Sequence, residues 1–186
     1  LSVRPASEPR VPLWIGANAD SAVRRAARLA DAWLINPHTT LPTVRRQLDM
    51  FADERRRSGL PAPDTVPVVR EVLCATRSED ARRLAERYLG AKYRAYSAWG
   101  QDKVLPDGES FEGAFGDLAS RRFVVGDPDE CLRQLMTWRS HTGADHFILR
   151  SHWSGMPVDV AATSLKLLSR EVLPELRSAP LVRQTY

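Results

Sequence analysis

Gly16, Ala17 and Asn18 stand between an apolar segment and an amphipathic one, and residues of these types at such a junction suit the binding of an anion. Glycine and alanine have little side chain to obstruct a ligand, and asparagine offers an amide. A helix that starts just after them presents unpaired N–H groups and the positive end of its dipole, which attract a phosphate or a carboxylate. The same residues also suit a tight strand-to-helix turn in which small side chains serve packing alone. The residues by themselves leave both interpretations open.

Two more polar clusters follow apolar segments. Asn36 and His38 come at the end of the second such segment, and Arg150, His152 and Trp153 end or follow the last one. In parallel βα folds, ligands bind at the carboxyl ends of the strands, so these side chains are candidates to line a pocket there. The alternatives are a surface or capping role for His38 and a loop that is held by the packing of Trp153.

Other catalytic chemistry has no support in the motifs. No His-Glu-x-x-His, Gly-x-Ser-x-Gly or Walker sequence is present. The histidines lack the paired spacing of metal ligands, and we therefore expect no metal; they are His38, His141, His146 and His152. No general acid or base stands out, so the catalytic residues stay unassigned.

The composition is that of a globular protein, with 186 residues, 43% hydrophobic residues and a formal net charge of +4. We expect a single domain over residues 1–186. No apolar run approaches the ~20 residues that span a bilayer, so no membrane contact is expected. The basic residues, nearly all arginine, alternate with acids on expected helix faces, so nucleic-acid binding is not expected either. Cys74 and Cys131 lie far apart among apolar residues, which favours buried free thiols in a reducing cytoplasm.

Short apolar segments alternate with amphipathic ones along the chain. The expected strands are residues 12–16, 33–36, 66–75 and 146–150, and the expected helices are residues 20–30, 42–57, a stretch from 78 onward, 128–142 and 161–176. Leu29 is placed on the apolar side of the first helix, and Ser78 is expected to cap the third. Asp127 and Gly143 carry strong start and stop signals for the fourth. Pro174 is expected to end or kink the last helix.

This alternation predicts a parallel (βα) barrel of the TIM type, of which the chain holds about four βα units. An insertion over residues 99–125, with a short helix near residues 117–121, precedes the last unit. Such a half barrel leaves two edge strands and an apolar sheet face uncovered. We therefore expect either a homo-oligomer or a partner that supplies the other half.

Five motifs follow one another at a characteristic spacing. They are Val11-Pro-Leu-Trp-Ile-Gly-Ala-Asn18, Val69-Arg-Glu-Val-Leu-Cys-Ala75, Phe123-Val-Val-Gly-Asp-Pro-Asp-Glu-Cys131, Thr142-Gly-Ala-Asp-His-Phe-Ile-Leu-Arg150 and Glu171-Val-Leu-Pro174. Their order resembles the C-terminal half of the luciferase-like flavin-dependent monooxygenases. The resemblance covers roughly residues 9–177, and the motifs are specific in their order and spacing rather than singly.

The resemblance implies a reduced-flavin oxidoreductase that uses FMN, or a deazaflavin coenzyme, on a small organic substrate. It assigns the coenzyme phosphate to residues 16–18, although Ala17 stands where a second glycine is common in the family, and it places Asn36 and His38 beside the phosphate or the substrate. The N-terminal half of the family's barrel has no counterpart in this sequence, which begins at Leu1. We therefore expect the chain to be a fragment, or a half barrel that is inactive alone.

Overall fold

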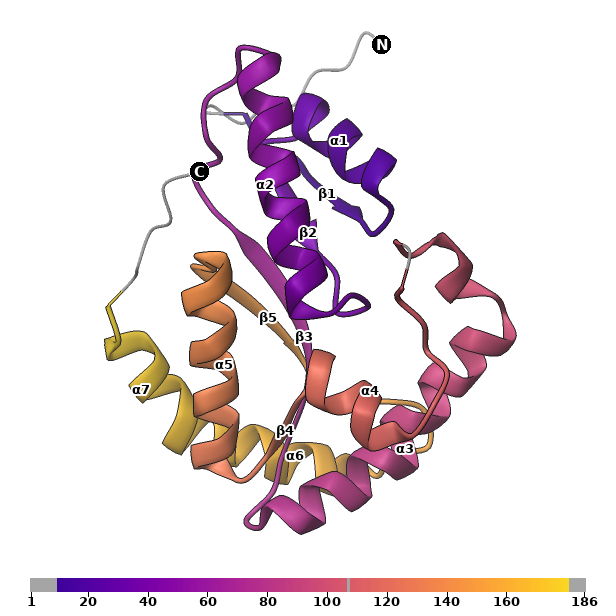
Figure 1. Ribbon diagram of the computed structural model, residues 1–186. Coiled ribbons are helices and arrows are strands. Elements are labelled where there is room, and N and C mark those ends of the chain that lie inside the picture. The colour runs from indigo at the N-terminus through magenta and orange to yellow at the C-terminus, as the bar shows by residue number, and fades with distance from the viewer. Residues whose placement is uncertain (1–9, 107, 181–186) are drawn as a thin grey trace, which may run out of the picture.

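Alternating strands and helices build a parallel sheet in the computed structural model, which describes residues 10–106 and 108–180 (Figure 1). Four strands lie side by side in the order β1, β2, β3, β5, and β4 pairs with β3. The strands are β1 (Trp14–Ala17), β2 (Ala32–Ile35), β3 (Pro67–Cys74), β4 (Val124–Gly126) and β5 (His146–Arg150). The predicted parallel α/β architecture is confirmed. The short strand β4 was not expected, because three residues inside an insertion give too little periodicity to identify a strand.

The helices follow the expected segments closely. They are α1 (Asp20–Leu29), α2 (Leu41–Arg57), α3 (Ser78–Ala98), α4 (Phe115–Arg122), α5 (Pro128–Thr142), α6 (Val158–Leu167) and α7 (Leu173–Ser178), with a 3₁₀ turn at Gln101–Val104. A π-helical turn at Leu168–Val172 separates α6 from α7, just before Pro174. The expected interruption of the last helix is therefore confirmed, since a proline removes one backbone donor from the helical ladder. Residue 107 of the expected insertion and the two ends of the expected domain lie outside the described residues.

Two local predictions were wrong. Ser78 is the first residue of α3 rather than its cap, and its hydroxyl donates to the carboxylates of Asp127 and Glu130 at 2.7 and 2.6 Å. The carboxylates at the start of α5 therefore use the hydroxyl that could have capped α3. Leu29 is 63% exposed, while Ala27 is fully buried. The buried stripe of α1 therefore runs through Val23, Ala26 and Ala27, where small side chains allow a close approach to the sheet.

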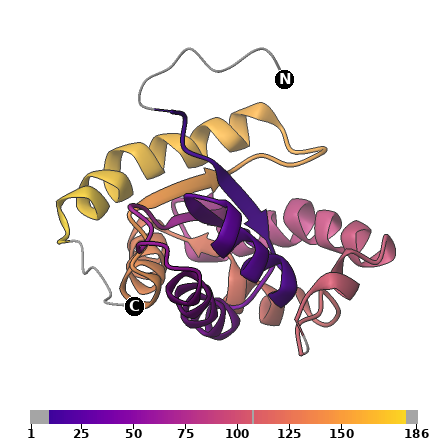
Figure 2. The same cartoon turned by 90° about the horizontal axis from the view of Figure 1, so that it is seen from above.

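The sheet has a face that packs on helices and an inner face opposite to it. Trp33, Ile35 and Val68 belong to one core cluster with residues of α1, α2 and α5. Side chains alternate between the faces along a strand, so Trp14 and His146 point to the inner face, where their rings meet at 5.1 Å. Seen from above, α2 and α5 lie side by side, and α6 and α7 lie on the other side of β5 (Figure 2). The helices α1, α2 and α5 thus cover one face of the sheet, as the outer helices of a barrel do.

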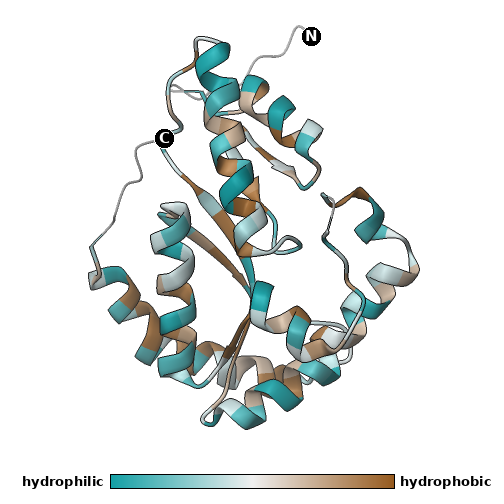
Figure 3. Cartoon of the chain, viewed as in Figure 1, coloured by the Kyte–Doolittle hydropathy of each residue, from teal (hydrophilic) through white to brown (hydrophobic). Residues whose placement is uncertain are grey.

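The central strand β3 changes its neighbours halfway along. Residues 67–71 pair with β5 and Val68 pairs with β2, whereas residues 72–74 pair with β4. All eight residues of β3 are buried. Leu73 packs in a cluster with α3, and Val72 packs in another with α5 and the end of α6. Figure 3 shows the apolar colour of β3, β4 and β5 between helices whose outer sides are hydrophilic.

Cys74 and Cys131 are buried free thiols, as the sequence indicated. Within residues 10–106 and 108–180, no helix has both the length and the apolar character needed to cross a membrane.

Replacing Gly143 by alanine should destabilise the protein by about 1 kcal/mol, because this residue ends α5 in the left-handed region at φ 68°, where a Cβ is strained. Gly116 is the matched control. It lies inside α4 with nothing within 4 Å of an added Cβ, so alanine there should be neutral or stabilising. Urea unfolding followed by tryptophan fluorescence measures both, and equal losses would contradict the conformational explanation.

Candidate functional site

The carboxyl ends of β1 and β2 carry three hydrogen-bonded polar side chains. The Asn36 amide donates to Asn18 Oδ1 at 3.2 Å, and Asn18 Nδ2 lies 3.3 Å from His38 Nδ1. Gly16 lies beside them on the inner face, and a Cβ added there would meet only the Asn36 amide, at 3.5 Å or more. The glycine therefore does not relieve a clash, because an added Cβ would make an ordinary contact with the Asn36 side chain. The structure thus brings the predicted Gly16, Asn18, Asn36 and His38 together.

A cavity of about 450 Å³ opens at the N-terminus of α1. Its lining comes from the start of α1, from α2 and from the insertion: Ala19, Asp20, Ser21, Arg46, Leu105 and Pro106. The α1 cap, Ala19, makes no side-chain hydrogen bond, so the first N–H groups of the helix are not capped by it. Arg46 donates to both oxygens of Asp20, at 2.6 and 2.9 Å, and this lowers the pKa of the Asp20 carboxyl. Because the arginine neutralises that acid, the helix dipole remains available to an anion.

Ala17 does not belong to the open space. Its side chain is 6% exposed and packs against the helices, and its carbonyl accepts the Trp33 indole N–H at 3.0 Å. Sequence reasoning missed Arg46 and Gln47, which come from the second turn of α2. Gln47 is fully buried and donates to the Asn18 carbonyl at 2.7 Å. A glutamine on the apolar side of α2, next to Leu48, was the one available signal.

His38 is held as a neutral imidazole. An amide N–H of Asn18 faces Nδ1, which places the ring proton on Nε2, and that atom is buried without a partner among the described residues. Burial, helped by the positive charges of Arg150 and Lys92, lowers the pKa of His38 to about 4. The ring edges of Tyr93 and Tyr96 lie against it at centroid distances of 6.1 and 5.8 Å. The His38 side chain as a whole is only partly buried, but its Nε2 atom does not reach solvent.

A buried carboxylate organises the other predicted residues. Glu71 of β3 is fully buried and accepts from Lys92 Nζ at 2.6 Å, Arg150 Nη2 at 2.5 Å and the Trp153 indole at 2.7 Å. Trp153 is thus both a buried loop anchor and part of the site. His152 Nε2 instead donates to the Met156 carbonyl within its own loop, at 3.0 Å. Sequence reasoning missed Glu71 and Lys92, although an acid in an apolar strand was a signal.

The insertion is tied to the start of α2. Glu109 accepts the Thr40 backbone N–H at 3.0 Å and the hydroxyls of Thr40 and Thr43, both at 2.5 Å. Arg122 of α4 forms an ion pair with the other carboxylate oxygen, and both side chains are almost fully buried. Burial opposes ionisation of Glu109, but these hydrogen bonds and the Arg122 charge outweigh it and lower its pKa. The carboxylate therefore caps α2 and holds the insertion at the carboxyl end of β2.

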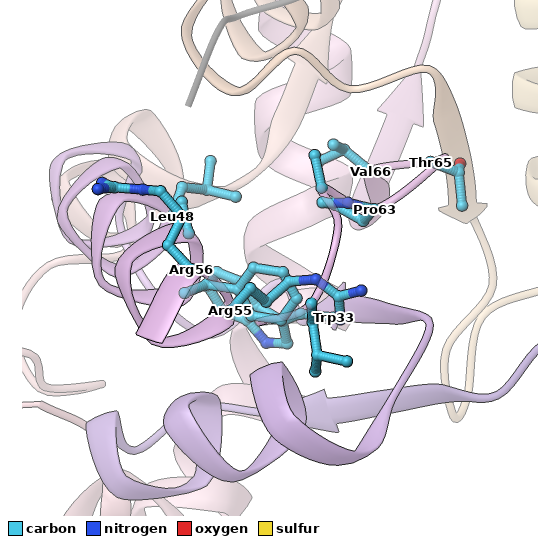
Figure 4. A pocket seen from close by; sticks show the side chains of 11 residues that line it. Trp33, Leu48, Arg55, Arg56, Pro63, Thr65 and Val66 are labelled. Carbon is cyan, nitrogen blue, oxygen red and sulfur yellow. The ribbon is translucent and has the colours of Figure 1, made fainter. Parts of the chain in front are cut away.

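Another cavity, of about 130 Å³, lies at the opposite end of the sheet, between α2 and the loop before β3 (Figure 4). Trp33, Leu48 and Val66 give it an apolar lining. It contains none of the predicted site residues, and in βα folds the amino ends of strands serve stability rather than ligand binding. Across the described ranges, no group of three histidine, cysteine or acidic residues could hold a metal ion.

The sequence matches the family model of the luciferase-like monooxygenases over residues 1–146. No curated protein sequence matches the chain. Among solved structures, the monooxygenase RslO1 from Streptomyces bottropensis is similar with a TM-score of 0.72 and 18% identity, covering 94% of this chain and 51% of that one.

Two further structures carry coenzyme-related ligands. The oxygenating constituent of 3,6-diketocamphane monooxygenase from Pseudomonas putida, in complex with FMN, has a TM-score of 0.63 and 19% identity, covering 87% of this chain and 47% of that one. An F420-dependent secondary alcohol dehydrogenase, in complex with an F420–acetone adduct, has a TM-score of 0.68 and 15% identity, covering 96% and 52%. At these identities the similarity establishes the fold, and the chain spans about half the length of each structure.

Lowering the pH from 7 to 5 should destabilise the protein by about 2 kcal/mol through His38 alone. Its folded pKa of about 4 lies below the ordinary value near 6.5. The unfolded chain therefore takes up the proton first, and the stability present above pH 6.5 is lost toward pH 4. Denaturant unfolding at several pH values measures this loss of stability. His38→Gln should reduce the loss, and the control His141→Gln, at an exposed histidine, should leave it unchanged. An unchanged pH dependence in His38→Gln would contradict the burial of a neutral ring.

Proposed function

Because this chain belongs to the luciferase-like monooxygenase family, we propose that it is the C-terminal half of a reduced-flavin-dependent monooxygenase barrel that acts on a small organic substrate. The observation that carries the proposal is the α1 cavity beside the polar cluster at the carboxyl ends of β1 and β2. The same end of the sheet holds the ligands of βα barrels generally. The single domain expected over residues 1–186 is, on this proposal, half of the (βα)₈ barrel.

The coenzyme phosphate fits the start of α1. Its ligands would be the first backbone N–H groups of α1, the Ser21 hydroxyl and the outer edge of the Arg46 guanidinium, which is half exposed. Gly16 leaves room beside them, Ala17 supports the turn through packing, and Asn18 presents its amide. Asn36 would fix the Asn18 amide through their hydrogen bond.

A flavin bound here would supply the redox chemistry, while the protein positions it and excludes water. FMN is our first assignment, and a deazaflavin coenzyme is the alternative, because both carry a phosphate that the same donors could bind. On the substrate side we place His38, Arg150, His152 and Trp153. His38 would present an uncharged N–H, Arg150 a positive charge, and Trp153 an apolar wall held by its bond to Glu71.

The uncovered strands point to a larger assembly. β1 and β5 each pair with one neighbour within the described residues, and Trp14 and the exposed His146 mark the inner face between them. We infer that this half barrel self-associates or pairs with a partner that supplies the N-terminal half, and that turnover requires the missing half. Buried free cysteines fit a reducing compartment, and we accordingly place the protein in the cytoplasm.

FMN should bind the full chain more tightly than riboflavin, because only FMN carries the phosphate. Arg46→Gln should lower the affinity for FMN about tenfold, as expected for the loss of one charged hydrogen-bond donor. The affinity for riboflavin should stay unchanged. Arg25→Gln is the control, since Arg25 is exposed on α1 and does not line the cavity. Titration calorimetry at 0.1 M salt gives the affinities, with a phosphate-bearing deazaflavin titrated in parallel. Equal affinity for FMN and riboflavin would contradict the phosphate assignment.

The chain should associate as its concentration rises. Leu13→Lys should shift the equilibrium toward the monomer, because a charge beside the β1 edge opposes strand addition. Leu29→Lys on α1 is the control, since this leucine is 63% exposed and lies on neither edge strand. Light scattering over a concentration series measures the mass. A monomer at every concentration, with cooperative unfolding, would contradict the assembly.

A further inference from the structure

A cavity of about 550 Å³ lies between α3 and the loop that follows β5. One side of α3 and the loop supply its lining, which combines two cations with several aromatic rings. The residues that matter here are Lys92, Tyr96 and Trp99 of α3, and Arg150 and Trp153 from the end of β5 and its loop. The cavity is distinct from the one at the start of α1, with which it shares no residue.

One buried carboxylate stands behind the two cations of this cavity. Glu71 is fully buried and binds Lys92 and Arg150 through the same oxygen, at 2.6 and 2.5 Å. One negative charge therefore faces two positive charges, which leaves an excess of one positive charge at the cavity wall. His38 does not compensate it, because the ring is neutral.

Both cations keep unused hydrogen-bond donors. A lysine ammonium has three N–H groups, and Lys92 has Glu71 as its one hydrogen-bond partner among the described residues. Arg150 uses Nη2 for Glu71, which leaves N–H groups of its guanidinium for a ligand. The Arg150 side chain is 40% exposed and that of Lys92 is 16% exposed, so both reach the cavity. A second anion is the group that would satisfy these donors and the excess charge.

The walls suit a flat apolar body. Trp99 is 71% exposed at the end of α3, and its ring lies 6.0 Å from that of Tyr96 at an interplanar angle of 39°. Trp153 closes the other side and is held by its indole bond to Glu71. Aromatic pairs of this kind bury large planar surfaces and orient them. Trp99 therefore offers an exposed ring face to a planar ligand beside the two cations.

We propose that this cavity binds a planar aromatic carboxylate, with its ring against Trp99 and Tyr96 and its carboxylate on Lys92 and Arg150. Glu71 is a positioning residue, since it touches the two cations and the Trp153 indole rather than the ligand. The proposal rests on the proposed function in one respect, because it names the substrate class of the side that holds Arg150 and Trp153.

The probe is 2-naphthoate, compared with the uncharged 2-naphthylmethanol and the non-aromatic cyclohexanecarboxylate, in titration calorimetry with the full chain at pH 7. We expect 2-naphthoate to bind about tenfold more tightly than either control compound, because it alone meets both the two cations and the aromatic side chains. Lys92→Met should abolish the preference for 2-naphthoate over 2-naphthylmethanol, and Trp99→Ala should lower the affinity for both. Arg94→Met is the charge control, because Arg94 is exposed on α3 and does not line the cavity.

Equal affinities for 2-naphthoate and 2-naphthylmethanol would overturn the proposal. Unchanged binding of 2-naphthoate to the Trp99→Ala variant would overturn it too, because this substitution at an exposed residue leaves the fold intact. Displacement of 2-naphthoate by riboflavin would also overturn it, because the cavity would then hold the flavin ring. FMN binding separates the two proposals. If FMN binds and 2-naphthoate does not, the substrate class is wrong and the flavin assignment stands. If 2-naphthoate binds and neither FMN nor the deazaflavin does, the cavity stands and the flavin assignment fails.

Discussion

All eight residues of β3 are buried, and a strand that is buried on both faces needs a layer of helices on each. Leu73 is covered by α3, while Val72 and Cys74 are covered by α5 and the segment after α6. The covering of Leu73 brings α3 across the inner face at the carboxyl end of the sheet. That position delivers Lys92 and Tyr96 to the candidate site, so the packing of one strand decides which side chains a ligand can meet.

Two adjacent residues of β3 carry opposite charges to opposite faces. Arg70 is fully buried, stacks on the Trp138 ring at 3.4 Å and donates to the Asn36 carbonyl at 3.4 Å, and its burial lowers its pKa to about 9. Glu71 is satisfied by Lys92, Arg150 and Trp153. Buried charges of this kind are weak sources of stability, since desolvation offsets most of the attraction, but removing one partner leaves an uncompensated charge. Their effect here is to fix the positions of their partners, while burial and the charges of Arg150 and Lys92 keep the neighbouring His38 neutral against the opposing charge of Glu71.

The insertion and the edge strands have contrasting roles. Glu109 holds the insertion against the first turn of α2. Leu105 and Pro106 of the same insertion line the cavity at the start of α1. One segment therefore contacts two helix N-termini. The inner face between β1 and β5, in contrast, has no further strand among the described residues. The chain spans about half of each similar structure. Its insertion lies against the carboxyl end of the sheet, whereas the inner face stays open among the described residues.

The sequence by itself determined the alternation of strands and helices, the family, and the start and end of α5, because periodicity, Asp127 and Gly143 act through neighbours within a few residues. It also identified Asn18, Asn36 and His38 as a group, since parallel strands end at one edge. The tertiary structure alone decided that Ala17 faces the helices, that Glu71 gathers Lys92 and Arg150, and that Glu109 caps α2. Glu71 is 21 residues from Lys92 and 79 from Arg150, and Glu109 is 69 residues from Thr40 of the α2 cap. No local sequence pattern indicates contacts over such separations. The physical reason is that burial of a charge is decided by which distant segments close over it.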